Sequence, residues 1–360
     1  MMKKFLIVFP SEWLAYSPTI LNMVKLLSVC GQVDIVSFWD EKTSYVKTLE
    51  ARVHFIKIPP MVFRVLAKLH LLRAYKLLSL LWVVFRKSRI KYDVSFGVDP
   101  LGFIAVRIFC GNPVFLSLEI EHNLWSEIAK TLRVSKLLIQ SQERMEFMFG
   151  KDSKFRYWIL PNSPIILPDM KQEFRKPKGH ILYFGNICKK HGVEFCIDSL
   201  KLMSDDIKLT LHGIITGDYF YYLNKKYSEL INNDRLCITS KYVEQADIHL
   251  YFNAFDIGLC LYDIEKSASP DFNYLSCPSG KMYDYFAAGL PVIGSNILGL
   301  QDVKIFSAGL LIDDYQPNTI IGAINHIYEN YSRYSAASYK AGCHFDFRKF
   351  FLLILDDLYQ

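Results

Sequence analysis

Short apolar runs alternate with helical patterns along both halves of the chain, and this alternation constrains the fold more than any other feature. In the first half, strand-like runs at residues 5–9 and 33–38 are separated by a helical pattern that begins at Ser17 and Pro18. The second half repeats the alternation from a strand that begins at residue 180 and ends at residue 185. Strands that alternate with helices form parallel sheets wrapped by helices. The sequence therefore predicts an α/β protein with two Rossmann-like, doubly wound domains.

The chain has 360 residues, which is enough for two domains of ordinary size. A segment rich in Pro and Lys at residues 168–178 has no periodicity and is the best candidate for a linker. We expect an N-terminal domain at 1–164, a C-terminal domain at 165–345, and a helix at 346–360 that packs back on the first domain. Two such domains imply a central cleft, because ligands bind at the carboxyl ends of the strands.

Charge is distributed unevenly along the chain. The net charge is +6, yet residues 52–92 contain ten Lys and Arg and no Asp or Glu. This local excess indicates an anionic partner for one surface and argues against nucleic acid. Residues 77–85 are all apolar except Ser79, and the segment resembles an interfacial element that faces anionic lipid, with a turn near residues 71–73. The alternative is an ordinary helical hairpin with solvated lysines.

Other features exclude whole classes of protein. The chain has eight cysteines without a C-x-x-C pair, so we expect free thiols in a reducing compartment. No run of eighteen apolar residues predicts a membrane span, and the N-terminal segment is expected to be a first strand and not a signal peptide. We therefore predict a cytoplasmic protein, peripheral on the inner face of the bacterial membrane.

The stretch at residues 275–296, LSCPSGKMYDYFAAGLPVIGSN, combines a helix with a buried strand. Pro278 suits a first helical turn, and Gly289 suits the helix end. Ser279, Gly280 and Lys281 would lie at the helix N-terminus, with Asp284 one turn later. Such an arrangement can bind a nucleoside diphosphate, since a helix N-terminus attracts anions. An amphipathic helix with a surface salt link is the alternative.

Several segments together resemble one family. They are ILYFGNICKKHGVEFCIDSL, AFDIGLCLY, SGKMYDYFAAGLPVIGS, LLIQSQERMEFMFG and LPNSP. In this order and spacing they resemble the retaining glycosyltransferases of GT-B fold often called family four (glycosyltransferases group 1). The resemblance implies two Rossmann-like domains facing a central cleft, with the acceptor bound by the domain at 1–164 and the nucleotide sugar by the domain at 165–345. It also implies transfer of a sugar from UDP- or GDP-sugar to a glycan acceptor with retention. We expect no metal cofactor, because the sequence has no Asp-x-Asp and charge on the leaving diphosphate would be neutralised by helix N-termini and lysines.

The resemblance also assigns roles to particular residues. Asp284 corresponds to the second acidic residue of the family's E-x7-E motif and would bind ribose hydroxyls, whereas Ser276 occupies the first acidic position. Asn186 and His191 replace the usual Arg and Lys of the glycine loop. The expected donor-binding residues are Gly185, Asn186, Lys190, Tyr242, Ser279, Gly280, Lys281 and Asp284. The expected catalytic contacts on the acceptor side are His122, Glu119 and Glu121.

These observations lead to one preferred function and two alternatives. The basic segment suggests a lipid-linked acceptor, as in bacterial O-antigen or capsule polysaccharide biosynthesis. A sugar-nucleotide epimerase shares the fold and would need no acceptor. A catalytically silent membrane-bound partner of another transferase would explain Ser276, Asn186 and His191.

Overall fold

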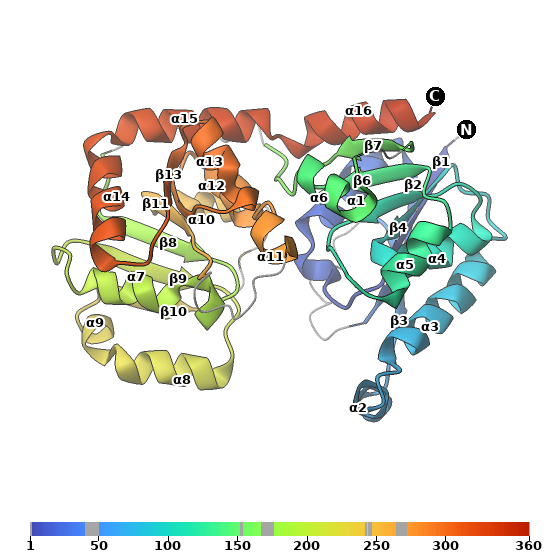
Figure 1. Ribbon diagram of the computed structural model, residues 1–360, viewed down its shortest axis with the longest axis horizontal. Coiled ribbons are helices and arrows are strands. Elements are labelled where there is room, and N and C mark those ends of the chain that lie inside the picture. The colour runs from blue at the N-terminus through green and yellow to red at the C-terminus, as the bar shows by residue number, and fades with distance from the viewer. Residues whose placement is uncertain are drawn as a thin grey trace. The chain divides into compact units, whose positions relative to one another are not determined.

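The computed structural model describes residues 2–39, 50–151, 154–166, 176–241, 243, 247–263 and 272–359. The chain divides into two compact units. The first comprises Met1–Asn162 and Phe347–Gln360, and the second comprises Ser163–Asp346. Figure 1 shows a sheet covered by helices in each unit. The predicted α/β architecture with two Rossmann-like sheets is therefore confirmed.

The first unit is built on a seven-stranded parallel sheet with the order β3-β2-β1-β4-β5-β6-β7. Its strands are β1 (Lys3–Phe9), β2 (Gly31–Phe38), β3 (Arg52–Ile56), β4 (Val94–Val98), β5 (Val114–Ser117), β6 (Lys136–Ile139) and β7 (Arg156–Ile159). The chain fills the sheet on one side of β1 and then continues on the other side from β4. The boundary between β1 and β4 is thus the point where the strand order reverses.

Helices connect these strands and cover the sheet. They are α1 (Pro18–Cys30), α2 (Pro60–Lys68), α3 (Leu72–Lys87), α4 (Asp99–Phe109), α5 (Leu124–Thr131) and α6 (Gln142–Phe149). Phe5, Ile7, Phe96 and Phe115 of the central strands are fully or almost fully buried and form the core beneath the helices. Strands buried on both faces read as continuous apolar runs, which is why they were recognisable in the sequence.

The second unit has a six-stranded parallel sheet with the order β10-β9-β8-β11-β12-β13. Its strands are β8 (His180–Phe184), β9 (Lys208–His212), β10 (Leu236–Thr239), β11 (Ile257–Cys260), β12 (Val292–Ser295) and β13 (Gly309–Ile312). Its helices are α7 (Val193–Leu200), α8 (Gly217–Lys226), α9 (Ser228–Asn232), α10 (Ile248–Phe252), α11 (Phe272–Ser276), α12 (Gly280–Ala287), α13 (Gln301–Ile305), α14 (Pro317–Glu329) and α15 (Tyr331–His344). The order reverses between β8 and β11.

One helix boundary differs from the sequence prediction. In the second unit, α14 and α15 meet at Asn330, and α8 and α9 meet at Tyr227. Pro278 does not begin the following helix, because α12 starts at Gly280 with Ser279 as its N-cap. The linker prediction at 168–178 falls largely outside the described residues.

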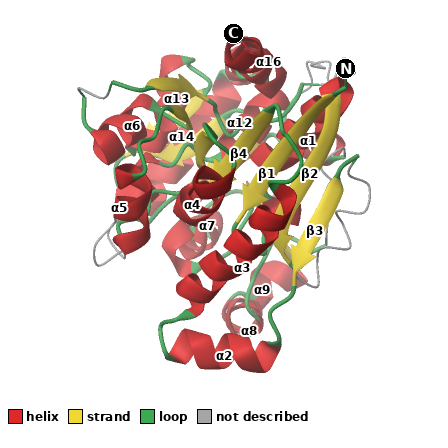
Figure 2. Cartoon of the chain, turned by 90° about the vertical axis from the view of Figure 1, so that its right-hand side faces the viewer, coloured by secondary structure: helices red, strands yellow, loops and turns green. Residues whose placement is uncertain are grey.

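The predicted turn in the basic segment is present, since α2 ends at Lys68 and α3 begins at Leu72. No side chain of α2 is buried, and α2 exposes Met61, Phe63 and Val65. Figure 2 shows α3 alongside the sheet and α2 beyond its end. Among the described residues, no helix has both the length and the apolar character that crossing a membrane requires.

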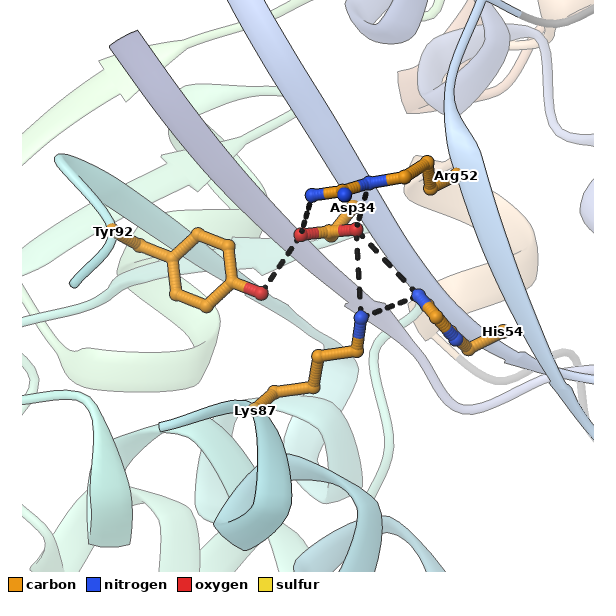
Figure 3. A network of polar contacts seen from close by, with 5 residues as sticks. All are labelled: Asp34, Arg52, His54, Lys87 and Tyr92. Carbon is orange, nitrogen blue, oxygen red and sulfur yellow. Dashed lines mark hydrogen bonds and ion pairs between the residues drawn. The ribbon is translucent and has the colours of Figure 1, made fainter. Parts of the chain in front are cut away.

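A network around one buried carboxylate fastens α3 to the edge of the first sheet (Figure 3). Asp34 on β2 accepts hydrogen bonds from Arg52 Nε (3.1 Å) and Tyr92 Oη (2.9 Å), and Lys87 Nζ at the end of α3 lies 3.5 Å from its Oδ1. His54 contacts both Lys87 and Asp34. Burial alone raises the pKa of Asp34, but Tyr92, Lys87 and Arg52 outweigh it and hold the pKa below its ordinary value.

The C-terminal helix α16 (Phe347–Tyr359) belongs to the first unit although it follows the second in sequence. Figure 1 shows it next to β7. Trp158 Nε1 on β7 donates a hydrogen bond to Asp357 Oδ2 (2.7 Å), and Phe351 packs with its ring centroid 6.4 Å from that of Phe96.

Candidate functional site

In the second unit, two loops at the reversal point of the sheet approach each other very closely. The backbone N–H of Gly185, after β8, donates to the carbonyl of His212 (2.8 Å). A Cβ atom at Gly213, after β9, would lie 1.8 Å from the carbonyl oxygen of Gly185. Gly185 and Gly213 both have φ values in the left-handed range, at 132° and 149°. Only glycine fits here, so the loop backbone is open to a ligand.

Helix α12 is fixed beside this loop by Tyr285. The ring of Tyr285 lies so close to β11 that a Cβ at Gly258 would be 2.4 Å from it. The Tyr285 hydroxyl accepts a hydrogen bond from the N–H of Phe184 (2.8 Å). Tyr285 is therefore a core residue that positions α12.

Lys281 is the cation of this site. Its Nζ donates to the Tyr183 hydroxyl (3.2 Å) and lies 4.4 Å from the centroid of the Tyr183 ring. Its side chain also approaches Gly185, whose added Cβ would meet Lys281 Nζ at 3.6 Å. No carboxylate of the described residues forms an ion pair with Lys281. Burial lowers the pKa of Lys281, because the protein supplies no compensating charge.

The other predicted residues of α12 lie around its N-terminus. Gly280 is its first residue, and Ser279 is buried, with its hydroxyl 4.0 Å from Cys260 Sγ. Asp284 is half-buried, and burial raises its pKa to about 7. Within the described chain its carboxylate has no hydrogen-bond partner, which leaves its oxygens available to the hydroxyl groups of a ligand.

The glycine loop carries a neutral histidine where the family has a cation. His191 Nδ1 lies 2.6 Å from the carbonyl oxygen of Asn186, so this nitrogen carries the proton. Burial and the neighbouring charge of Lys281 lower the pKa of His191 to about 4. The side chains of Asn186 and Lys190 are exposed, and Tyr242 lies outside the described residues.

Ser276 is buried at the end of α11 and does not replace the missing acid. Its hydroxyl donates to the carbonyl of Phe272 (2.6 Å), one turn earlier in the same helix. The hydroxyl is thus used within its own helix, and Asp284 is the acidic residue that remains at the two positions of the family's motif.

The first unit has a pocket of about 300 Å³ at the reversal point of its own sheet. Its walls come from residues that directly follow β1, β4, β5, β6 and β7, together with the start of α1. The lining residues are Phe9, Ser11, Trp13, Tyr16, Ser17, Pro18, Thr19, Asp99, Leu118, Glu119, Gln140 and Asn162. Carboxyl ends of parallel strands are where α/β proteins bind ligands, so this pocket is a second candidate site.

Two residues of this pocket were missed in the sequence. Asp99 has φ of +50°, which is uncommon for a residue other than glycine, and its Oδ1 accepts hydrogen bonds from the N–H groups of Leu118 (2.9 Å) and Glu119 (3.0 Å). Burial raises the pKa of Asp99 to about 7. Gln140 is almost fully buried, and its amide oxygen has no partner in the described part of the chain. Their positions directly after predicted strands were the available signal.

The three predicted catalytic residues are placed differently from one another. Glu119 lines the pocket. Glu121 does not line it and is held by Arg73 (3.2 Å) and Asn123 (2.6 Å). His122 is exposed and packs edge-to-face on Phe147, with ring centroids 4.8 Å apart. Catalytic roles for the three stay predictions, and the geometry favours Glu119 as the one in the pocket.

Comparison with known proteins gives a family match within the second unit and similar folds over the whole chain. Residues 178–330 match the family model Glycosyl transferases group 1, and no curated protein matches the chain. HepE from Anabaena, in complex with UDP and glucose, has a TM-score of 0.71 at 15% identity over 99% of both chains. A glycosyltransferase from Rickettsia africae gives 0.70 at 12% identity, covering 100% of this chain and 99% of that chain. WaaB, a lipopolysaccharide outer core galactosyltransferase, gives 0.64 at 14% identity, covering 98% and 99%.

Proposed function

We propose that this chain, which has a GT-B-like fold and matches the Glycosyl transferases group 1 model at residues 178–330, is a glycosyltransferase. In this proposal it moves a sugar from a UDP-sugar to a glycan acceptor. The single observation that carries this proposal is Lys281, a partly buried ammonium without a carboxylate partner among the described residues. A buried charge is costly unless it is paired. The diphosphate of a nucleotide sugar would supply the missing negative charge.

The surroundings of Lys281 fit the rest of such a donor. Backbone N–H groups at the start of α12 and in the loop after Gly185 can bind phosphate oxygens. Asp284, one turn along α12, would accept hydrogen bonds from ribose hydroxyls. UDP is preferred over GDP because HepE was solved with UDP and with UDP-glucose. Retention of anomeric configuration remains part of the proposal, as the family resemblance implies.

A lipid-linked acceptor at an anionic membrane surface completes the proposal. The support is α2, which buries no side chain, and the face of α3 that exposes Leu78, Trp82 and Phe85. Arg64 and Lys68 accompany these apolar groups on α2. Apolar and basic side chains on exposed helices favour the interface of an anionic bilayer. A role in surface polysaccharide biosynthesis, such as O-antigen or capsule, follows from such an acceptor.

The test uses Lys281→Met, which keeps the length of the side chain and removes its charge. We expect the variant to lose at least about tenfold in affinity for UDP, because one charge-assisted contact to a phosphate contributes more than about 1.4 kcal/mol. Without ligand it should be no less stable than the wild type, since an unpaired buried charge is removed. Calorimetric titration and thermal unfolding measure the two effects, and Lys225→Met on exposed α8 is the matched control.

A structural role for Lys281 would give the opposite pattern, with lower stability and unchanged UDP affinity. Two further results separate the rival functions. Absence of binding by UDP, GDP and CMP would favour the silent partner. Conversion of a UDP-sugar to free sugar or an epimer, with no dependence on any acceptor, would favour the epimerase.

A further inference from the structure

The pocket of the first unit contains hydrogen-bonding groups that the protein leaves unsatisfied. Gln140 is 6% exposed and its Oε1 accepts no hydrogen bond from the described residues. Asp99 uses Oδ1 for two backbone N–H groups, and the described chain provides no hydrogen bond to its Oδ2. Gln140 Oε1 is a buried acceptor without a partner, which lowers stability, and Asp99 Oδ2 is an acceptor on a partly buried side chain. They suit a ligand that donates hydrogen bonds, as a sugar hydroxyl does.

The charges of the pocket exclude one class of ligand. Its lining includes the carboxyl groups of Asp99 and Glu119, and none of the lining residues is Lys, Arg or His. Arg144 on α6 is fully buried, donates to the carbonyl of Leu118 (2.9 Å) and does not line the pocket. A phosphate or carboxylate bound here would therefore face negative charge without a counter-ion, which is how proteins reject a ligand.

The shape of the pocket indicates the size and chemistry of the ligand. A volume of about 300 Å³ is at the lower end for small-molecule sites and suits a single sugar unit. Trp13 is 51% exposed and packs edge-to-face against Tyr16, with ring centroids 6.0 Å apart. An aromatic face supplies contact area for the C–H groups of a pyranose, while the polar groups opposite bind its hydroxyls.

We propose that this pocket binds the terminal unit of the acceptor, and that this unit is an uncharged sugar. The inference rests on the proposed glycosyl transfer and deepens it by naming the acceptor class. The enzyme would then extend an existing glycan and would not attach a first sugar to a lipid phosphate. A separate transfer reaction that places a neutral sugar on the carrier must supply its substrate.

The experiment measures binding of methyl glycosides to the full chain in the presence of saturating UDP at pH 8. The neutral probes are the methyl glycosides of glucose, galactose, mannose and N-acetylglucosamine, and the anionic probes are methyl glucuronide and methyl glucoside 6-phosphate. Ligand-observed NMR titration gives each Kd. We expect at least one neutral probe to bind, and both anionic probes to bind at least about tenfold more weakly, because the pocket carries only negative charge.

Variants connect this preference to the pocket. Gln140→Leu and Asp99→Asn should each lower the affinity for the neutral probe at least about fivefold, because each removes a hydrogen-bond acceptor. Asp99→Asn should also reduce the ratio between the Kd of the anionic probes and the Kd of the neutral probes. Asn tolerates the left-handed backbone at this position, so the substitution should not strain the chain. The matched control is Glu143→Gln, which changes an exposed carboxylate on α6. It should change neither the Kd of the neutral probe nor the ratio of Kd values between anionic and neutral probes. A retained cooperative unfolding transition of the first unit, measured by calorimetry, shows that every variant is folded.

The results distinguish this inference from the proposed function. If UDP binds but anionic probes bind as well as neutral ones, or no neutral probe binds, the inference is overturned and the donor assignment stands. Binding of the neutral probe that is insensitive to Gln140→Leu and Asp99→Asn overturns it as well. If UDP itself does not bind, the proposed function fails and the acceptor role fails with it.

Discussion

At the residue scale, two partly buried ionisable groups of opposite charge define the candidate sites. Lys281 lies at the reversal point of the second sheet and Asp99 at that of the first. Both lack a counter-charge among the described residues, so each protein unit holds a charge that folding alone would not favour. Such groups persist where a ligand uses them, and this is the common physical basis of both assignments.

The raised pKa of Asp99 has a measurable effect on stability. Its folded pKa of about 7 exceeds the ordinary value of 3.8, so the folded state binds more protons between these values. The free energy of unfolding should therefore fall as pH rises from about 4 to about 7. In Asp99→Asn this contribution is absent, and the variant should gain about 1 to 3 kcal/mol relative to the wild type across that range. Denaturant unfolding at a series of pH values measures it.

Other charged groups near Asp99 are unchanged in that variant. The charges of Glu119 and Glu121 raise the pKa of Asp99. Arg73 forms an ion pair with Glu121, and Arg144 donates a hydrogen bond to the carbonyl of Leu118. Their own titration contributes equally to the free energy of unfolding of the wild type and of Asp99→Asn. It therefore cancels in the difference between the two proteins. Parallel stability curves for the wild type and Asp99→Asn would show that Asp99 ionises normally in the folded protein.

The sequence allowed site residues to be predicted only where the signal was local. Lys281 and Gly280 were identified because a helix N-terminus and its lysine are adjacent in sequence. Asp99 and Gln140 were not, because neither residue type is unusual after a strand. Their importance comes from a backbone φ of +50° and from burial, which depend on neighbours far away in the chain.

At the element scale, the structure changes the meaning of the basic segment 52–92. Four of its ten cations are ion-paired: Arg52 and Lys87 with Asp34, Arg73 with Glu121, and Lys76 with Glu12. These pairs hold α3 on the first unit, as the network in Figure 3 shows for Asp34. The described residues form no ion pair with Arg64 and Lys68 of α2, which leaves α2 as the element best suited to a membrane.

We expect the full chain to bind vesicles of phosphatidylcholine with phosphatidylglycerol more tightly than vesicles of phosphatidylcholine alone. Replacing both Arg64 and Lys68 by Gln should reduce binding to the anionic vesicles about tenfold, because each cation near such a surface contributes about 1 kcal/mol. Trp82→Ser on α3, where Trp82 is 63% exposed, should weaken binding to both kinds of vesicle.

Sedimentation with vesicles measures these effects. The matched control for Arg64 and Lys68 is the pair Lys225→Gln and Lys226→Gln on α8, and Leu353→Ser on α16 is the control for Trp82. Equal affinity for vesicles with and without phosphatidylglycerol would contradict an electrostatic role for α2.

At the scale of the whole molecule, the chain builds the first unit from both of its ends. Phe351 on α16 is fully buried in that unit, and Lys3 Nζ lies over the ring of Tyr359. The first unit is therefore incomplete until the last residues have been synthesised, because part of its core comes from α16.

Truncation of Phe351 tests this dependence. Phe351→Ala should lower the free energy of unfolding of the first unit by about 3–5 kcal/mol, since it creates a cavity in the core. UDP affinity, which belongs to the second unit, should remain within about twofold of the wild type. Calorimetric unfolding with and without UDP separates the two units, and Leu352→Ala, at a side chain 40% exposed, is the control. An equal decrease in the free energy of unfolding in Phe351→Ala and Leu352→Ala would contradict a core role for Phe351.

The sequence by itself determined the α/β class, the alternation that produces two parallel sheets, and the helix with Lys281 and Asp284. These features depend on short-range patterns of apolar residues, glycine and proline, which a local segment carries without its neighbours. Only the tertiary structure decided that Tyr285 is a core residue, that Ser276 is satisfied within α11, and that Asp99 and Gln140 line a pocket. Burial and missing partners are properties of packing between distant segments, so no local pattern encodes them.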